Sequence, residues 1–387
     1  AYEISLGLVG SEMCIRDSLE GLSMGRRKYH APRRGSLGFV RKRAQRIYPR
    51  VLTWPKFDEP KLLGFPAYKV GMLSVIELYE RKGSMFHGVK RSVAATALEA
   101  PPIKLLAVRV YQDTPYGLKT IDEIWTSKLE DPIRVKPGED GREGGKPLLD
   151  YLRGRVTLPK DIKKAFGGDY LESKKEKIYD LINQGLIDEI KVLVATRPDL
   201  TGLGKKIPDI MEIKVGGNVK EAFDFALEKL GGYININEVF DVGQFVDIIG
   251  ITKGKGFQGV VKRFGVKILP PKTKKEKRAV GSLGPWTPGR VMWTVPRYGQ
   301  LGFFKRTEYN KQILAILVEN FEKLNPKGGW HKYGIIRNPA IVLRGSVQGP
   351  SKRMVILRHA IRPRIAPFVP KVEEFFVSRE RLEVSVQ

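Results

Sequence analysis

Apolar residues occur along much of the chain in short runs bounded by glycine, proline and other turn residues, a pattern typical of β-strands. Such strand patterns cover residues 67–75, 93–97 and 105–110. Residues 340–358 predict two more strands, joined by a turn that contains glycine, proline, serine and lysine. Two stretches have helical spacing instead: residues 120–125 predict a short helical turn, and residues 313–324 predict an amphipathic helix.

The middle of the chain has a different pattern. Residues 131–147 are rich in glycine, proline and charge, which indicates a domain boundary. Beyond it, expected helices and strands alternate: helices at residues 174–185 and 219–230, strands at 190–195 and 210–215. In the second helix Asn218 can cap the start and Gly231 the end. Its carboxylates fall on the polar side, which favours a solvated face over an acid/base pair; they are Glu221, Asp224 and Glu228.

A third pattern starts with an apolar, β-branched strand at residues 242–251. Glycines and cations come after it, and residues 260–264 predict a second strand. Glycine lets a backbone approach a ligand closely, and lysine offers a point charge for phosphate. We interpret this strand pair as an RNA-backbone contact at the rim of a β-barrel. One alternative is a plain hairpin turn without a ligand.

A second alternative for the same stretch is a dinucleotide site, since Gly254, Gly256 and Gly259 have the spacing of that fingerprint. The fingerprint also requires a helix that opens at the last glycine and an acidic residue about 20 positions further on. A strand is expected at 260–264, and Glu276 lies within a lysine-rich run. We therefore favour the RNA contact.

Charge narrows the function. The 387 residues include 69 Lys and Arg against 42 Asp and Glu, which gives a formal net charge of +27 and a pI near 9.9. Such an excess suits a protein that displaces counterions from nucleic acid. No apolar run approaches the 18 residues of a membrane-spanning helix, so nucleic acid is preferred over a membrane surface. Cys14 is the only cysteine and the four histidines are far apart, so the sequence predicts no zinc site, no cofactor and a reducing cytosol.

Two segments concentrate this charge. Residues 25–50 hold ten Lys or Arg and no acidic residue, with aromatics interleaved. This favours an arm that folds onto RNA over a solvated flexible tail. Residues 262–311 hold thirteen basic and two acidic residues and predict a hairpin-like extension with Trp286 near its tip. Stacking of Trp286 on nucleotides is preferred to a place in the core, because its glycine and proline neighbours offer nothing to pack against.

Residues 1–23 differ in composition from the rest of the chain and lack the features of a signal peptide. We expect them to be a non-native leader, with Met24 as the true start.

Four motifs in order carry a family resemblance: residues 24–39, 246–264, 286–293 and 345–350. Together they resemble universal large-subunit ribosomal protein three in its archaeal and eukaryotic-type form. The resemblance implies a mixed β-barrel and α/β fold, with a six-stranded barrel like that of translation factors, an α/β insert and long basic N-terminal and central extensions. It also implies a structural constituent of the large ribosomal subunit in the cytoplasm. Such a protein binds large-subunit rRNA and neighbouring ribosomal proteins, supports assembly, and shapes the peptidyl transferase region near tRNA, with no membrane and no homo-oligomer.

The expected organisation comprises a leader at 1–23, a basic N-terminal extension at 24–60, the first part of the barrel at 61–130, an α/β insertion at 131–238, a glycine/lysine strand pair at 239–264, a tryptophan-tipped finger at 265–311, and a helix with closing barrel strands at 312–387. The expected rRNA-binding residues are Arg26, Arg27, Lys28, Arg33, Arg34, Arg41, Lys42, Arg43, Arg46, Lys253, Lys255, Phe257, Lys262, Arg263, Lys272, Lys274, Lys275, Lys277, Arg278, Trp286, Arg290, Trp293, Arg297, Lys305, Arg306, Lys352 and Arg353.

Two other classes of function fit a basic chain less well. An RNA-processing or RNA-modifying enzyme with a basic surface needs a nucleophile with its base, a metal cluster or a phosphate-binding loop, and the sequence offers none of these. A DNA-compacting protein would not need a long aromatic finger. The structural rRNA-binding protein is preferred, and we expect no enzyme activity.

Overall fold

The computed structural model describes residues 35–36, 39, 41–80, 83–126, 168–205, 207–273, 276–363, 368–377 and 380–382. The chain divides into two compact units. One consists of Ala1–Arg41 with Gly256–Leu301, and the other of Lys42–Lys255 with Gly302–Gln387. Both units therefore combine segments that are far apart in the sequence.

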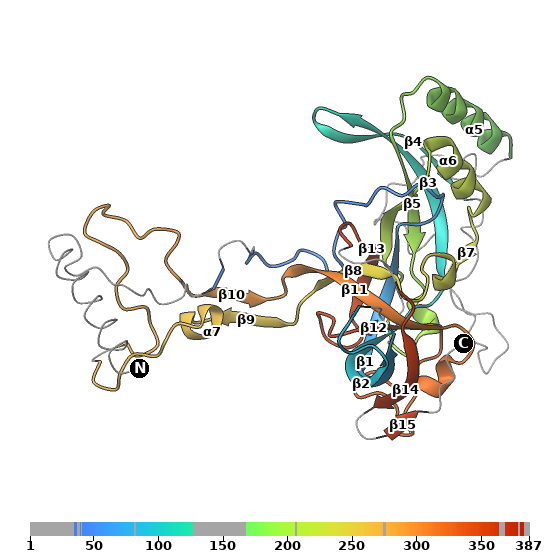
Figure 1. Ribbon diagram of the computed structural model, residues 1–387. Coiled ribbons are helices and arrows are strands. Elements are labelled where there is room, and N and C mark those ends of the chain that lie inside the picture. Colours follow the sequence, from blue (N-terminus) through green and yellow to red (C-terminus); the bar gives the residue numbers. More distant parts are fainter. Residues whose placement is uncertain are drawn as a thin grey trace, which may run out of the picture. The chain divides into compact units, whose positions relative to one another are not determined.

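The larger unit contains an eight-stranded sheet (Figure 1). Its strands are β1 (Gly64–Tyr79), β2 (Val89–Glu99), β8 (Phe245–Ile251), β11 (Lys305–Leu317), β12 (Ala340–Arg344), β13 (Met354–His359), β14 (Lys371–Val377) and β15 (Glu380–Leu382). Their order is β13-β8-β11-β12-β2-β1-β14-β15, and β13 also pairs with β1. The antiparallel pairings of β1, β2, β12, β11, β8 and β13 therefore return to their starting strand.

Strand β1 pairs with β13 near its start and with both β2 and β14 further along. The register with β2 shifts between Lys69 and Gly71, which marks a β-bulge. A side chain at Gly71 would bring its Cβ within 2.6 Å of the Trp330 ring. Glycine is thus required at this position so that the indole of Trp330 can lie against the strand.

The same unit holds a second sheet with the order β4-β3-β5-β6, in which β7 also pairs with β3. Its strands are β3 (Ile103–Thr114), β4 (Gly117–Trp125), β5 (Glu189–Ala195), β6 (Ile210–Lys214) and β7 (Tyr233–Ile234). Helices α5 (Gly168–Asn183) and α6 (Val219–Glu228) pack against this sheet (Figure 1). Buried side chains of Phe223 and Ala226 from α6 join Ile178 of α5 in the core. As expected, Asn218 caps α6, and its side chain accepts a hydrogen bond from the N–H of Val219 at 2.8 Å.

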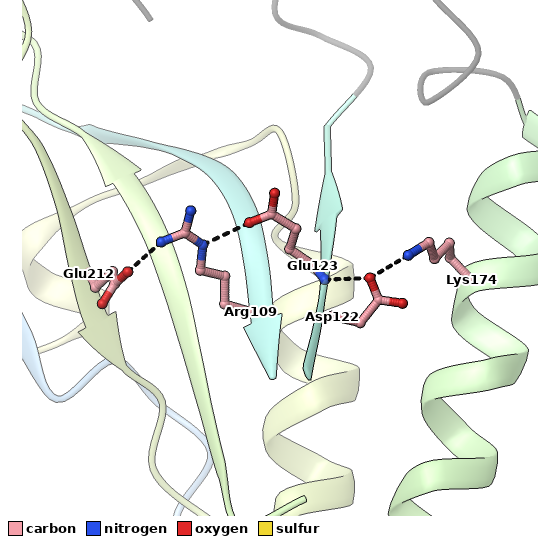
Figure 2. Close-up of polar contacts among 5 residues, drawn as sticks. All are labelled: Arg109, Asp122, Glu123, Lys174 and Glu212. Carbon is pink, nitrogen blue, oxygen red and sulfur yellow. Dashed lines mark hydrogen bonds and ion pairs between the residues drawn. The ribbon is translucent and has the colours of Figure 1, made fainter. Parts of the chain in front are cut away.

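Ion pairs cover part of this second sheet. Figure 2 shows Arg109 of β3 between Glu123 of β4 and Glu212 of β6, while Lys174 of α5 reaches Asp122. The Arg109–Glu123 distance is 2.9 Å. Burial lowers the pKa of Arg109, but the two carboxylates outweigh it and raise the pKa overall. The charges on this sheet are therefore largely compensated within it.

One hydrophobic core joins the two sheets of the larger unit. A polar contact also links them: the hydroxyl of Tyr68 on β1 donates to Thr196 Oγ1, just after β5, at 3.1 Å. Glu99 of β2 instead holds the segment before β12. Its fully buried carboxylate accepts bonds from the Tyr333 hydroxyl, the Arg337 N–H at 2.9 Å and the Asn338 amide at 2.7 Å. Three short 3₁₀ helices, η1 (Pro198–Leu200), η2 (Ile236–Glu238) and η3 (Phe321–Leu324), complete this unit among the described residues.

The smaller unit is built on the paired strands β9 (Gly254–Gln258) and β10 (Gly299–Gly302) and the one-turn helix α7 (Val260–Phe264). Gly259 precedes α7 as its N-cap. Gly265 ends the helix in a left-handed conformation with φ of 67°, and its N–H donates to Val261 O at 2.9 Å.

Most strand predictions are confirmed, but three local predictions are wrong. Residues 120–125 belong to strand β4 rather than a helical turn, because they pair with β3. Residues 313–324 contain the end of β11 and the 3₁₀ helix η3 instead of an amphipathic helix. Residues 260–264 form α7 and not a strand. The strand pair expected at 239–264 therefore does not exist: β8 pairs with β11 and β13, and β9 pairs with β10.

Candidate nucleic-acid interface

The smaller unit carries an excess of cations. Residues 256–301 contain ten Lys or Arg and one acidic residue, Glu276. Among the described residues, no carboxylate lies within ion-pair distance of the expected RNA-binding cations here, namely Arg41, Lys262, Arg263, Lys272, Lys277, Arg278, Arg290 and Arg297. Most of these side chains are exposed. Because no described carboxylate neutralises these cations, they can bind a polyanion outside the chain.

Arg263 organises the base of this unit. Its guanidinium donates to Gln300 O at 2.9 Å and to Arg297 O at 2.8 Å. These bonds join α7 to the strand β10 and to the segment before it. Burial, and then the charge of Arg41, lower the pKa of Arg263. Two cations therefore share one site without a compensating carboxylate among the described residues.

Exposed aromatic rings accompany the cations. Trp286 is 96% exposed, as expected for a residue whose glycine and proline neighbours offer nothing to pack against, and Trp293 is 76% exposed. Phe257 on β9 is also exposed, with its ring 5.5 Å from that of Tyr298. Rings held out to solvent beside cations form the type of surface on which unpaired bases stack.

The larger unit has a second group of expected residues, gathered around Phe303. The guanidinium of Arg43 lies 5.6 Å from the centre of this ring, and that of Arg353 lies 5.3 Å from it. The N–H of Phe303 donates to Lys253 O at 3.1 Å, and Phe303 O accepts from the N–H of Ala44 at 2.9 Å. We call Arg43, Lys253, Phe303 and Arg353 the Phe303 cluster. Three segments distant in sequence thus meet at Phe303: the guanidinium groups of Arg43 and Arg353 lie near its ring, and Lys253 contacts it through its backbone.

The backbone next to this cluster is tightly folded. Phe303 has a φ of 55° and Gly302 a φ of 71°. A Cβ at Gly302 would lie 2.0 Å from Lys253 O, so only glycine is compatible with this close approach. The turn that places Arg353 also depends on a left-handed residue, Lys352, with a φ of 70°.

Other expected residues of the larger unit lie nearby or on its surface. Lys305 folds back to donate to Arg50 O at 2.6 Å, and burial followed by Arg358 and Arg50 lowers its pKa. Arg306 lies over the Phe304 ring at 5.0 Å. Lys42, Arg46 and Lys255 are exposed. Arg26, Arg27, Lys28, Arg33, Arg34, Lys274 and Lys275 lie outside the described residues, as does the expected leader at 1–23.

The dinucleotide alternative fails for a different reason from the one expected. A helix does open at Gly259, so the absence of a helix is not the ground for rejecting it. The helix has five residues and follows a two-stranded sheet. The fingerprint requires a βαβ unit with a parallel sheet, and this arrangement does not provide one.

Sequence reasoning missed the buried residues that hold the interface in place. Lys69 is nearly buried and donates to Val347 O and, at 3.1 Å, to Gly349 O. Burial and then Lys253 lower the pKa of Lys69. In the sequence, Phe303 is only one of several aromatics in the basic segment. Its place beside Gly302 was the available signal, but its cationic partners come from segments that local patterns do not connect.

The described part of the chain offers neither a group of residues that could hold a metal ion nor a helix that could span a membrane. No three His, Cys, Asp or Glu residues there are grouped so that they could hold a metal ion. None of its helices has the length and apolar character needed to cross a membrane.

The chain is similar to known proteins over nearly its whole length. The family model described as Ribosomal protein L3 matches residues 24–381. The large ribosomal subunit protein uL3 of Archaeoglobus fulgidus is 45% identical over 345 residues, covering 88% of this chain and 95% of that protein. The uL3 protein of Methanothermobacter thermautotrophicus is 43% identical over 341 residues, covering 87% of this chain and 93% of that protein. The uL3 protein of Methanocaldococcus jannaschii is 44% identical over 352 residues, covering 90% of this chain and 96% of that protein. The chain belongs to the ribosomal protein L3 family.

Proposed function

We propose that this chain is a structural constituent of the large ribosomal subunit, in the cytoplasm, and that it binds large-subunit rRNA and neighbouring ribosomal proteins. The observation that carries the proposal is the row of exposed cations in residues 256–301 that no described carboxylate compensates. The uL3 relatives are large ribosomal subunit proteins. Ribosomal L3 proteins are structural and not enzymes, so family membership removes the alternative of an RNA-modifying enzyme.

Phosphate neutralisation supplies most of the affinity in this proposal. The cations of the smaller unit and of the Phe303 cluster meet phosphates, and exposed glycines such as Gly256 allow the RNA backbone to come close. Trp286 stacks on an unpaired base near the site of tRNA binding. We further propose that the closed circuit of β1, β2, β12, β11, β8 and β13 is the six-stranded barrel of translation-factor type, and that the chain enters the subunit as a single copy.

Sedimentation tests the first part. The tagged full chain, expressed in cells, is expected to sediment with large subunits. Its affinity for purified large-subunit rRNA is expected to fall steeply with salt, by roughly a thousandfold or more between 50 and 200 mM for six or more phosphate contacts. A chain absent from large subunits, or a shallow dependence on salt, would overturn the proposal.

Substitution of the exposed tryptophan tests the second part. Trp286→Ala is expected to change tRNA accommodation or the response to drugs that act at the catalytic centre, while the fold stays intact because Trp286 is 96% exposed. Tyr116→Ala, at the fully exposed tip between β3 and β4, is the matched control and should leave both readouts unchanged. Ribosomes that carry Trp286→Ala and behave as wild type would refute the role of the tip.

A further inference from the structure

The smaller unit contains a pocket of about 520 Å³ that is separate from the tip residue Trp286. Its wall combines three arginines with exposed rings, and the residues that matter for its chemistry are Phe39, Arg41, Arg263, Phe264, Trp293 and Arg297. Its volume falls within the roughly 300–1,000 Å³ that is usual for sites of small ligands. The pocket is therefore large enough to receive one monomer of a polymer.

Packing within the unit builds one side of the pocket. The guanidinium of Arg41 lies 4.3 Å from the centre of the Phe264 ring, and that of Arg263 lies 5.2 Å from the same centre. At Gly35, with a φ of 75°, a Cβ would lie 3.1 Å from both Phe264 Cδ1 and Arg41 Nη2. Gly35 thus lies against Phe264 of α7, and two guanidinium groups already lie over the Phe264 ring.

The other side of the pocket presents rings to solvent. Trp293 is 76% exposed and Phe39 is 58% exposed, although both line the same hollow. Large exposed rings in a concave site mark a place where a flat apolar group binds. The adjacent charge is positive only, since the described part of the chain brings no carboxylate to the three arginines.

The arginines do not all have the same task. Arg263 uses its N–H groups on the carbonyl oxygens of Gln300 and Arg297, so it holds the wall together. Arg41 and the exposed Arg297 make no ion pair with a described residue, which leaves their guanidinium groups available to an anion. A ligand that fits must join a flat aromatic ring to phosphate.

We propose that this pocket receives one unpaired nucleotide of RNA, whose base stacks on Trp293 and whose phosphates meet Arg41 and Arg297. The inference rests on the proposed rRNA binding and adds a particular site to it. A nucleotide is favoured over a protein side chain because the pocket combines stacking surface with uncompensated positive charge. Capture of a single extruded base would fix the position of this unit along the RNA strand.

Site-specific crosslinking tests the pocket. The full chain with p-benzoylphenylalanine in place of Trp293 is built into large subunits in cells and irradiated, and the crosslinked position in rRNA is mapped by primer extension. A crosslink to one unpaired nucleotide is the expected result. The same replacement at Tyr116, on the β3–β4 turn, is the control and should not label that nucleotide.

Three results would refute nucleotide binding in the pocket while leaving the proposed function in place. They are a crosslink to another protein, a crosslink to base-paired RNA, and incorporation of the chain into large subunits without any crosslink from position 293. Labelling of the same nucleotide from position 116 would overturn it as well. Failure of the unmodified chain to enter large subunits would instead refute the proposed function, and this inference with it.

Binding measurements give a second readout. Trp293→Ala is expected to weaken binding to an rRNA fragment that contains the mapped nucleotide by roughly 5- to 150-fold, the usual range for loss of one stacked base. Trp293→Phe, which keeps a ring, should lose much less. Equal losses in the two variants, or no loss in either, would show that the ring does not stack on a base.

Discussion

The α/β sheet of the larger unit and residues 256–301 of the smaller unit treat charge in opposite ways. On the sheet, Arg109 lies between Glu123 and Glu212, and Lys214 pairs with Glu189 at 2.7 Å. In residues 256–301, ten basic residues accompany one acidic residue. Residues 256–301 therefore carry a net charge of +9 out of the +27 of the chain, so positive charge is concentrated there relative to the α/β sheet. The ion-paired charges on the sheet stabilise the fold, whereas the cations of residues 256–301 that make no described ion pair can bind RNA phosphates.

The largest effect on stability is expected where a paired charge is fully buried. Asp247 is 0% exposed and accepts a bond from the guanidinium of Arg358 at 2.7 Å. Asp247→Asn should lower the free energy of unfolding by about 3–5 kcal/mol, because it leaves the arginine buried without a counter-charge. Urea unfolding measures the loss.

A matched variant checks that interpretation. Glu276→Gln, on an exposed carboxylate, should change the free energy of unfolding by less than about 0.5 kcal/mol. The double variant Asp247→Asn with Arg358→Met should recover part of the loss, since the unpaired charge is gone. A small effect of Asp247→Asn would show that the buried pair is not needed for the fold.

A buried histidine provides the next test. His359 lies between the rings of Phe57 and Phe240, with centres at 5.1 and 4.7 Å. Burial, and then Lys61, lower its pKa to about 4. In the unfolded chain the pKa is about 6.5. Between these two pKa values the unfolded state therefore binds more protons than the folded state. The contribution of His359 to the free energy of unfolding is fully present above pH 6.5 and is lost as the pH falls towards 4.

The expected loss from this group is roughly 3 kcal/mol across that range. It is obtained by comparing the pH dependence of urea unfolding for wild type and His359→Phe, so that the other groups that titrate cancel. The wild-type curve should be steeper between pH 6.5 and 4. Parallel curves would mean that His359 takes up a proton as easily in the folded protein as in the unfolded chain.

A smaller effect is expected for the partly buried ion pairs of Figure 2. Arg109→Met leaves two carboxylates without their shared cation and should cost about 1–3 kcal/mol of unfolding free energy. Lys174→Met removes the partly exposed pair with Asp122 and should cost less than about 1 kcal/mol. If both variants lost the same amount, the central position of Arg109 would have no special importance.

The smallest effect on stability is expected in the unpaired region, where RNA binding should respond instead. The variant with glutamine at Lys272, Lys277, Arg278 and Arg290 should keep its unfolding free energy within about 0.5 kcal/mol. The slope of log affinity against log salt should become less steep by roughly 3 if each residue meets one phosphate. Its control carries glutamine at the ion-paired Lys174, Lys191, Lys205 and Lys214, and should lose stability while its slope stays unchanged. The reverse pattern would refute the division between paired and unpaired charge.

Local patterns predicted the strands well, since 67–75, 93–97 and 105–110 all lie within β1, β2 and β3. They failed where an apolar run is buried on both sides. Ile313, Leu314 and Ala315 are all fully buried, so both faces of β11 are covered at this end, where the strand pairs with β12. Without an alternation of buried and exposed positions, such a run cannot be told from a helix by spacing alone.

The candidate interface was predictable in composition but not in arrangement. Runs of lysine and arginine identified Arg43, Lys253 and Arg353 one by one. Their meeting around Phe303 depends on the pairing of β8 with β11 and on left-handed residues at 302, 303 and 352. Buried partners such as Lys69 give no signal in a count of surface charge. Contacts between segments distant in sequence are what the local pattern lacks.

Strand β1 has one edge against β2, which follows it at once, while its other edge meets β13 and β14 near the end of the chain. During synthesis that second edge stays open until residues 354–377 have emerged. An unpaired, apolar strand edge promotes self-association of nascent chains. A truncated chain that ends before residue 354 should therefore aggregate. Synthesis of the last strands, which cover the open edge of β1, is the step that protects the new chain from self-association.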